Sequence, residues 1–319
     1  MQNNNLSPEI LVEYVRDGLI EQEHRGFVVL ANKDKALDYV GDSKNYPFFL
    51  RSCAKPLQAS LIIDYEMDKI FHMDEKEIAF CCASHAGEKL HTDIAEKLLQ
   101  KMGIDENYLR CGLHKPLSKT RQIEMLLNKE SETQLQNNCS GKHIMMLGLC
   151  KINDWSLEDY YKTDHPLQIT IKNKIYELCS IKHEYPITTD GCGVPIASMP
   201  LENMLKGYLN VFCNEKYEKI KNSFLNNPYI IGGEDRTDTF IMQNSKGIIA
   251  KVGAGGLCIV VNIKQEEAFV IKISDCDMRA RELVVCQVLK NLQWADIKTD
   301  KTIKTLHGDI VGEIEIKAY

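Results

Sequence analysis

Residues 51–56 read Arg51-Ser52-Cys53-Ala54-Lys55-Pro56, with a serine and a lysine three positions apart at the expected start of a helix. Residues three apart on a helix share one face, with roughly 5–6 Å between their Cβ atoms. A serine hydroxyl needs a base before it can act as a nucleophile, and a lysine can be that base when burial or a second cation lowers its pKa. The spacing therefore makes Ser52 and Lys55 a candidate nucleophile and base.

The Ser-x-x-Lys spacing is a weak signal on its own. It serves serine β-lactamases and penicillin-binding proteins. Four loosely specified residues also recur by chance, and a helix-capping serine followed by a solvated lysine would look the same. Other features of the sequence are needed to distinguish a catalytic pair from a capping serine with a solvated lysine.

Length and composition predict one globular unit. The chain has 319 residues, of which 44% are hydrophobic, and its net charge is only −6, without long blocks of one sign. These values argue against nucleic acid as a partner. The start Met1–Asn5 is polar, and no stretch approaches the roughly 18 apolar residues of a membrane span. We therefore expect a cytoplasmic protein that does not bind membranes, with most of its scattered cysteines reduced.

The hydrophobic pattern changes twice along the chain. It is strand-like at 10–15, 26–31 and 36–40, and again at 247–252, 257–262, 267–273 and 310–317, with a helix at about 277–293 before the last strand. Between them it is helical, at 53–63, 74–83, 88–102, 142–152, 166–179, 199–211 and 215–225. We predict a single α+β unit over 1–319, with an antiparallel sheet from both chain ends, approximately 1–50 and 230–319, and an inserted helical region over about 51–229.

Two further segments carry candidate partners for the first pair. Cys82-Ala83-Ser84-His85-Ala86-Gly87-Glu88 places a second serine at a helix end. Ala250-Lys251-Val252-Gly253-Ala254-Gly255-Gly256 places a lysine at the end of a predicted strand, as Lys-Thr-Gly does in serine β-lactamases. A second cation there would lower the pKa of Lys55 or polarise Ser84. A capping serine and a solvated lysine are the ordinary alternatives.

Cys139 and Cys192 lie in two other unusual segments, Asn137-Asn138-Cys139-Ser140-Gly141-Lys142-His143 and Asp190-Gly191-Cys192-Gly193-Val194-Pro195. Cys139 and Lys142 are one helical turn apart. Two thiolates could bind zinc, but a structural zinc site usually has four Cys or His ligands, and lysine coordinates only when deprotonated. The residues alone leave open whether these are zinc ligands or two free thiols in a tight turn.

Several segments, taken together and in order over roughly residues 47–281, resemble the Rhizobium etli-type L-asparaginase family. They are Phe49-Leu50-Arg51-Ser52-x-x-Lys55-Pro56, Ala83-Ser84-His85-x-Gly87-Glu88-x-x-His91, Arg110-Cys111-Gly112-x-His114, Asn138-Cys139-Ser140-Gly141-Lys142-His143, Asp164-His165-Pro166-x-Gln168, Asp190-Gly191-Cys192-Gly193 and Gly232-x-x-x-Arg236-x-Asp238-Thr239. The resemblance implies a penicillin-binding-protein or serine β-lactamase-like fold, a homodimer, and hydrolysis of L-asparagine to L-aspartate and ammonia.

The resemblance also implies roles for individual residues. It implies two catalytic pairs, Ser52 with Lys55 and Ser84 with Lys251. It implies a Zn²⁺ site whose ligands are Cys139, Lys142 and Cys192. With this resemblance, Arg51 would suit the substrate carboxylate and Asp190 would suit the substrate ammonium group. His143 would contact either the substrate or the metal shell.

One position departs from the family pattern, which usually reads Lys-x-Gly-Ala-Glu-Gly after the last strand lysine. This chain has Gly255 in place of the acid. The substitution puts in doubt whether the charge balance around Lys251, and with it the pH optimum, follows the family.

We therefore expect Ser52, deprotonated by Lys55, to attack the side-chain amide of L-asparagine and form an acyl-enzyme. One alternative is an amidase for glutamine or another small amide with the same groups. A second is a non-catalytic zinc- or amino-acid-binding protein, although both Ser/Lys pairs are intact.

Overall fold

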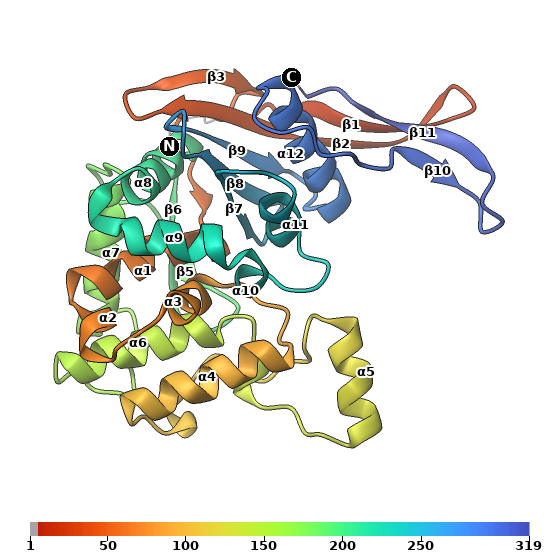
Figure 1. The fold of residues 1–319 in the computed structure, drawn as a ribbon. Helices are drawn as coiled ribbons and strands as arrows, with labels where there is room; N and C mark the ends of the chain where they lie inside the picture. Colours follow the sequence, from red (N-terminus) through yellow and green to blue (C-terminus); the bar gives the residue numbers. More distant parts are fainter. Residues whose placement is uncertain (1–5, 319) are drawn as a thin grey trace.

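A computed structural model describes residues 6–318 (Figure 1). The polar start Met1–Asn5, which supported the cytoplasmic expectation, and Tyr319 lie outside the described residues. Strands from both chain ends form one eight-stranded sheet in the order β10-β11-β1-β2-β9-β8-β7, with β3 paired to β2. All of these pairings are antiparallel. The expected α+β class, with a sheet built from both ends of the chain, is confirmed.

The N-terminal strands form a meander around one long strand. They are β1 (Glu9–Arg16), β2 (Leu19–Asn32) and β3 (Ala36–Val40). Asp17 and Gly18 join β1 to β2, and both have positive φ, 49° and 78°. An Asp-Gly pair with positive φ at both positions is a favoured two-residue hairpin turn, because its twist matches that of the strands. The length of β2 lets it pair with β1 and β3 in turn and with β9 on its other edge.

The C-terminal strands lie on both sides of β1 and β2 and form both ends of the strand order. They are β7 (Ile248–Gly253), β8 (Leu257–Asn262), β9 (Glu267–Ile273), β10 (Thr302–Lys304) and β11 (Ile310–Ile316). Every residue of β7 and β8 is buried. Helix α12 (Met278–Asn291) packs against β9, and α8 (Leu201–Phe212) packs against β2 and β9. Strands covered on both faces explain why these segments are almost continuously apolar.

The helical region lies between the two sets of strands, below the sheet in Figure 1. Its longer helices are α1 (Lys55–Asp64), α3 (Glu75–Cys82), α4 (Lys89–Met102), α5 (Lys119–Asn128), α6 (Ser140–Ile152), α7 (Pro166–Leu178), α9 (Glu218–Asn226) and α11 (Thr237–Gln243). Shorter pieces are α2 (Met67–Ile70), α10 (Pro228–Ile231) and the 3₁₀ turns η1 (Arg51–Ala54), η2 (Glu106–Tyr108), η3 (Gln134–Gln136) and η4 (Glu215–Tyr217). None of the helices in residues 6–318 is long and apolar enough to cross a membrane.

Two contacts bring the helical region to the edge of the sheet. The turn η1 packs against β7, which is the edge strand, and α11 packs against the same strand. A small second sheet in the order β4-β6-β5 joins β4 (Phe48–Phe49), directly before η1, to β6 (Pro195–Met199) and β5 (Ile187–Thr189). The candidate residues of both halves of the chain therefore meet at one junction.

Several elements escaped the sequence-based expectation. Helix α5, the short strand β10 and the small sheet were not expected. In α5 only Arg121 and Met125 are buried, while Ile123, Leu126 and Leu127 are exposed. A helix whose apolar residues do not form one buried stripe gives little of the periodic signal on which the prediction depends.

Helix packing at the junction leads to a stability prediction. A Cβ on Gly141 of α6 would lie 2.1 Å from the carbonyl oxygen of Phe80 in α3. We expect Gly141→Ala to force the two helices apart and lower the free energy of unfolding by about 1–3 kcal/mol. Chemical denaturation followed by circular dichroism measures this. Gly191→Ala is the matched control, because no atom lies within 4 Å of its Cβ position. Equal midpoints for the two variants would contradict the close packing of α3 on α6.

Candidate active site

Ser52 and Ser84 line one cavity of about 270 Å³ at the junction of η1, the loop after α3, and the turn after β7. Residues 253–256 of that turn form another wall, and their small side chains leave the cavity open. A larger cavity of about 680 Å³ lies beside α5 and contains none of the predicted site residues. The structure thus brings the two serines from distant parts of the sequence to one small space.

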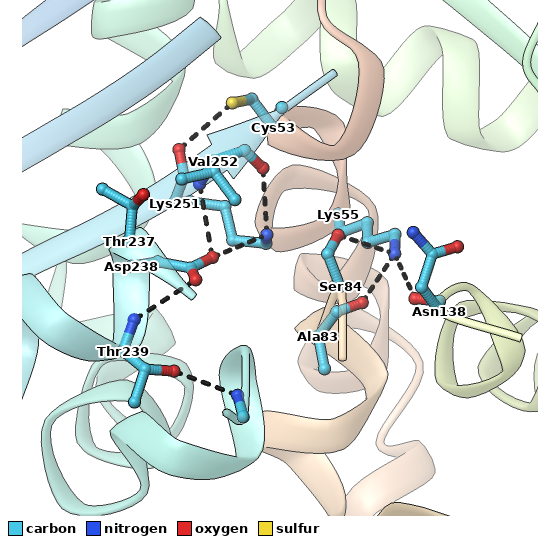
Figure 2. A network of polar contacts seen from close by, with 12 residues as sticks. Cys53, Lys55, Ala83, Ser84, Asn138, Thr237, Asp238, Thr239, Lys251 and Val252 are labelled. Atoms are coloured by element: carbon cyan, nitrogen blue, oxygen red, sulfur yellow. Dashed lines mark hydrogen bonds and ion pairs between the residues drawn. The ribbon is translucent and has the colours of Figure 1, made fainter. Parts of the chain in front are cut away.

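Lys55 lies behind the cavity and is fully buried. Its Nζ donates to the carbonyl oxygens of Ala83 at 2.6 Å and Asn138 at 2.9 Å, and contacts Ser84 Oγ at 2.9 Å (Figure 2). Burial lowers the pKa of Lys55 to about 8, and the positive charges of Lys142 and Lys251 also lower it. The lysine is therefore much easier to deprotonate than one in water.

Only one of the three partners of Lys55 can give it a proton. Carbonyl oxygens are acceptors only, whereas a serine hydroxyl both donates and accepts. When Lys55 is neutral, its two hydrogens can stay on the carbonyls of Ala83 and Asn138 and its lone pair can accept from Ser84. This arrangement suits a general base that acts through Ser84.

The lysines are paired differently from the expectation. The expected pairs were Ser52 with Lys55 and Ser84 with Lys251. In the structure Lys55 contacts Ser84, and Lys251 Nζ contacts Asp238 Oδ2 at 3.2 Å and the carbonyl oxygen of Val252 at 3.0 Å. Lys55 does not contact Ser52 because the three hydrogens of its ammonium group already have partners. Lys251 contacts Asp238 because a carboxylate attracts an ammonium group more strongly than a serine hydroxyl does.

Asp238 on α11 is the residue whose role the sequence did not reveal. Asp238 and Lys251 are both fully buried, and the carboxylate also accepts from the backbone N–H of Val252 at 3.4 Å. Burial alone would raise the pKa of Asp238, but Lys251 and Arg236 outweigh it and hold the pKa below its ordinary value. An acid shortly before the apolar residues Phe240-Ile241-Met242 of α11 was the available signal for a buried ion pair.

Ser52 differs from Ser84 in exposure and bonding. Ser52 is half-buried and its hydroxyl makes no hydrogen bond within the described part of the chain, whereas Ser84 is buried. The preceding Arg51 has φ of 47°, in the left-handed region that a side chain rarely adopts. Strain of this kind costs on the order of 1–3 kcal/mol and collects at functional sites. Ser52 is thus the more accessible hydroxyl of the two.

The thiol segments also converge. One potential ligand atom from each of Cys139, Asp190 and Cys192 lies within 4.8 Å of the others, and all three residues are buried. Lys142 Nζ is 2.9 Å from Cys192 Sγ and 3.8 Å from Asp190 Oδ2. The hydrogen bond from Cys192, with help from Lys55 and Lys142, lowers the pKa of Cys139 well below its ordinary value. A buried thiolate beside a second thiol and a carboxylate fits the donor preference of zinc.

The expected substrate-binding residues lie beside this thiol cluster. Arg51 Nε donates to Asp190 Oδ1 at 2.8 Å. His143 is fully buried; its Nδ1 contacts the hydroxyl of Tyr160 at 2.6 Å, and its Nε2 has no hydrogen-bond partner in the part of the chain that the structure describes. The Tyr160 hydroxyl also accepts from the backbone N–H of Arg110 at 3.0 Å. Tyr160 was not expected, because it lies in a tyrosine-rich segment that resembles ordinary core.

The predicted residues fall into two neighbouring groups. Ser52 and Ser84 line the cavity, whereas Arg51, His143 and Asp190 do not. Asn138 connects the two groups. It lines the cavity and its carbonyl oxygen accepts a hydrogen bond from Lys55, and the residue that follows it is the thiol-cluster residue Cys139. Lys55 therefore lies between the serine cavity and the thiol cluster.

Distant similarities to solved structures accompany this geometry. A β-lactamase from Mycobacterium bovis aligns over 83% of this chain and 94% of its own, with 12% identity and a TM-score of 0.37. A Bacteroides dorei protein described provisionally as a β-lactamase aligns over 83% and 93%, with 10% identity and a TM-score of 0.43. Mglu in its glutamate form aligns over 86% of this chain and 63% of its own, with 11% identity and a TM-score of 0.37. We assign the α+β class from the strand pairings and not from these alignments.

Sequence comparison gives a clearer relationship. Curated proteins provide no match. The family model for L-asparaginase II, however, matches residues 12–315, which include every predicted site residue. This family agrees with the resemblance seen in the sequence motifs and supports an asparaginase-type amidohydrolase that acts on a small-molecule amide. The chain therefore belongs to the L-asparaginase II family.

Proposed function

We propose that this chain hydrolyses the side-chain amide of L-asparagine to L-aspartate and ammonia through an acyl-enzyme on Ser52. The observation that carries the proposal is the contact of 2.9 Å between Lys55 Nζ and Ser84 Oγ behind a cavity that both serines line. A buried amine with a lowered pKa, bonded to a hydroxyl that faces the substrate space, is the arrangement that serine nucleophiles require.

In the acylation step, Ser52 Oγ forms a bond to the amide carbon. The Ser52 proton passes to Ser84 while the Ser84 proton passes to Lys55, which becomes an ammonium group. The C–N bond then breaks, and the leaving nitrogen takes a proton back through Ser84, so that ammonia departs. Ser52 is the attacking group because it is accessible and unbonded, whereas Ser84 is buried and held by Lys55.

In the deacylation step, water replaces ammonia. A water molecule in the cavity loses a proton to the Ser84–Lys55 pair and attacks the ester carbon. The bond between that carbon and Ser52 Oγ breaks, and the proton returns to Ser52. The same base therefore serves both halves of the reaction, as microscopic reversibility requires.

Lys251 acts in this proposal as a fixed cation. Its amine contacts the Asp238 carboxylate and the carbonyl oxygen of Val252, and neither of these groups is a serine. Its positive charge lowers the pKa of Lys55 and favours negative charge that develops on the serine oxygens. Lys251 thus contributes through its charge and Asp238 holds that charge in place.

The thiol cluster fits a zinc ion, with Cys139, Lys142 and Cys192 as the proposed ligands and Asp190 within reach. Burial would lower the pKa of Lys142, but Cys139, Cys192 and Asp190 outweigh it and raise the pKa. Lys142 must therefore lose a proton before it can coordinate, which makes metal binding dependent on pH. A bound zinc ion would supply a positive centre that orients the substrate, since the serines already provide the nucleophile.

The remaining sequence-based expectations stay predictions. They are substrate contacts by Arg51, His143 and Asp190, a homodimer, and a cytoplasmic location. An amidase for glutamine or another small amide would use the same serines and lysines. Ammonia release from a panel of amides therefore has to be measured alongside release from L-asparagine.

Ser52→Ala should lower ammonia release from L-asparagine by about 10³-fold or more, because no other accessible hydroxyl can form the ester. Ser84→Ala should lower kcat by about 10²-fold, since it interrupts the path of the proton to Lys55. Coupled ammonia assays measure both, and mass spectrometry of quenched reactions detects the acyl group. Ser60→Ala is the control, because Ser60 is a buried serine of α1 that bonds only to the carbonyl oxygen of Leu57.

An acyl group that forms on Ser52→Ala but not on Ser84→Ala would show that Ser84 is the nucleophile. Near-normal activity in both variants would exclude serine catalysis altogether.

The pH dependence of kcat/KM should report the titration of Lys55. The base must be neutral, so kcat/KM should fall about tenfold per pH unit below an inflection near pH 8 and level off above it. Rates measured from about pH 6 to about pH 10 in one salt concentration give the profile. An inflection near 10.5, the ordinary value for lysine, would exclude Lys55 as the base.

Removal of the metal should weaken substrate binding more than it slows the chemistry. After treatment with a chelator and confirmation of metal loss by elemental analysis, we expect KM for L-asparagine to rise by about tenfold and kcat to change by less than about threefold. Added Zn²⁺ should restore KM. Complete loss of kcat in a folded, metal-free enzyme would contradict a role limited to substrate orientation.

A further inference from the structure

A buried arginine without a counter-ion faces the serine cavity. Arg281 is in the first turns of α12, lines the cavity, and is only 6% exposed. Its Nη1 donates to the carbonyl oxygen of Gly253 at 3.4 Å and its Nη2 to Thr237 Oγ1 at 3.3 Å, both long contacts. Its Nε has no partner among the described residues.

The rest of the cavity wall does not neutralise this charge. Arg236 also lines the cavity, and its Nε likewise has no hydrogen-bond partner within residues 6–318. None of the cavity-lining residues is an aspartate or a glutamate. At position 255 a glycine lines the wall, and no atom lies within 4 Å of its Cβ position. Two arginines therefore line one small space whose lining, in the described part of the chain, includes no carboxylate, although Arg236 also lines a second cavity with Glu234, Asp235 and Glu282.

A buried charge without a partner is unfavourable, so a site of this kind favours an anion from outside. A guanidinium binds a carboxylate particularly well, because its planar N–H groups match the two oxygens. The cavity of about 270 Å³ is near the lower end of the size range of ligand pockets, which suits a molecule as small as an amino acid. The expected ligand of the arginines is therefore a small carboxylate that reaches the two serines.

Arg51, the residue expected to bind the substrate carboxylate, is placed differently. Its Nε is already bonded to Asp190, and neither residue lines the cavity. The two expected substrate-binding groups thus partly neutralise each other beside the thiol cluster. Arg281, in contrast, shares the cavity with the proposed nucleophile and lacks a carboxylate partner.

We infer that Arg281, with Arg236 beside it, binds the α-carboxylate of the amino-acid amide in the serine cavity, in place of Arg51. The inference rests on the proposed function and deepens it, because it makes the α-carboxylate a requirement for productive binding. Arg281 is a specificity-determining residue in this scheme, and it takes no part in proton transfer.

The test compares two substrates that differ only in the group that Arg281 would bind. L-asparagine carries an α-carboxylate, whereas L-asparaginamide carries an uncharged amide there. For Arg281→Gln we expect KM for L-asparagine to rise by about 30-fold or more, the usual effect of removing one partner of a buried charge pair. KM for L-asparaginamide should change by less than about threefold. Arg281→Lys should recover part of the loss, because it restores the charge without the planar fork.

Controls separate a binding effect from a folding defect. Arg279→Gln changes an exposed arginine on the same helix, whose Nη2 donates to the carbonyl oxygen of Asp300 and which lies outside the set of cavity-lining residues, and it should leave both KM values unchanged. Thermal unfolding of each variant checks the fold. Calorimetric binding of L-aspartate to Ser52→Ala, with and without Arg281→Gln, gives a second readout that needs no turnover, and binding should weaken by at least about 30-fold.

Each contrary result has a distinct meaning. If Arg281→Gln raised KM equally for both substrates, or for neither, the assignment of Arg281 would fail while the proposed function stood. If instead Arg51→Gln raised KM for L-asparagine and left KM for L-asparaginamide unchanged, Arg51 would be the residue that binds the α-carboxylate. A wild-type enzyme that released no ammonia from L-asparagine would refute the proposed function itself, and the inference with it.

Discussion

The burial of two lysine amines at the edge of the sheet is the constraint on which the site depends. Lys55 and Lys251 are at most 1% exposed, so each amine must find its partners inside the protein. Most of those partners come from distant segments: residues 83, 84 and 138 for Lys55, and residue 238 for Lys251, which also contacts the carbonyl oxygen of its neighbour Val252. The amines are satisfied only when η1, α3, α6, α11 and β7 have all assembled, so the fold and the catalytic geometry form together.

The two lysines are equally buried, yet their surroundings assign them opposite roles. Lys251 forms an ion pair with the Asp238 carboxylate. Lys55 has two carbonyl oxygens and a hydroxyl, which are neutral partners, and two other lysines lower its pKa further. The difference depends on one carboxylate.

The sequence was sufficient for most of the fold but only for part of the site. Apolar runs such as 257–262 and 267–273 predicted β8 and β9 within one residue, because buried strands leave a direct compositional trace. Motif spacing pointed to Ser52 with Lys55, and the family resemblance added Ser84 with Lys251, whereas in the structure Lys55 contacts Ser84 and Lys251 contacts Asp238. Spacing along a helix describes local neighbours, whereas the contact of Lys55 with Ser84 joins residues 29 apart. Asp238 and Arg281 escaped assignment for the same reason, since their contacts depend on tertiary packing.

The charge distribution explains why the serine cavity is the part of the junction that needs a ligand. Beside the thiol cluster, Arg51 and Asp190 already form an ion pair, and Lys142 contacts Cys192, so positive and negative groups lie together. Around the cavity, Asp238 is occupied by Lys251, and Arg236 and Arg281 have unpartnered Nε atoms. The protein has therefore neutralised one side from within and left the other positively charged. A carboxylate that enters the cavity completes this balance, and a neutral amide of the same size does not.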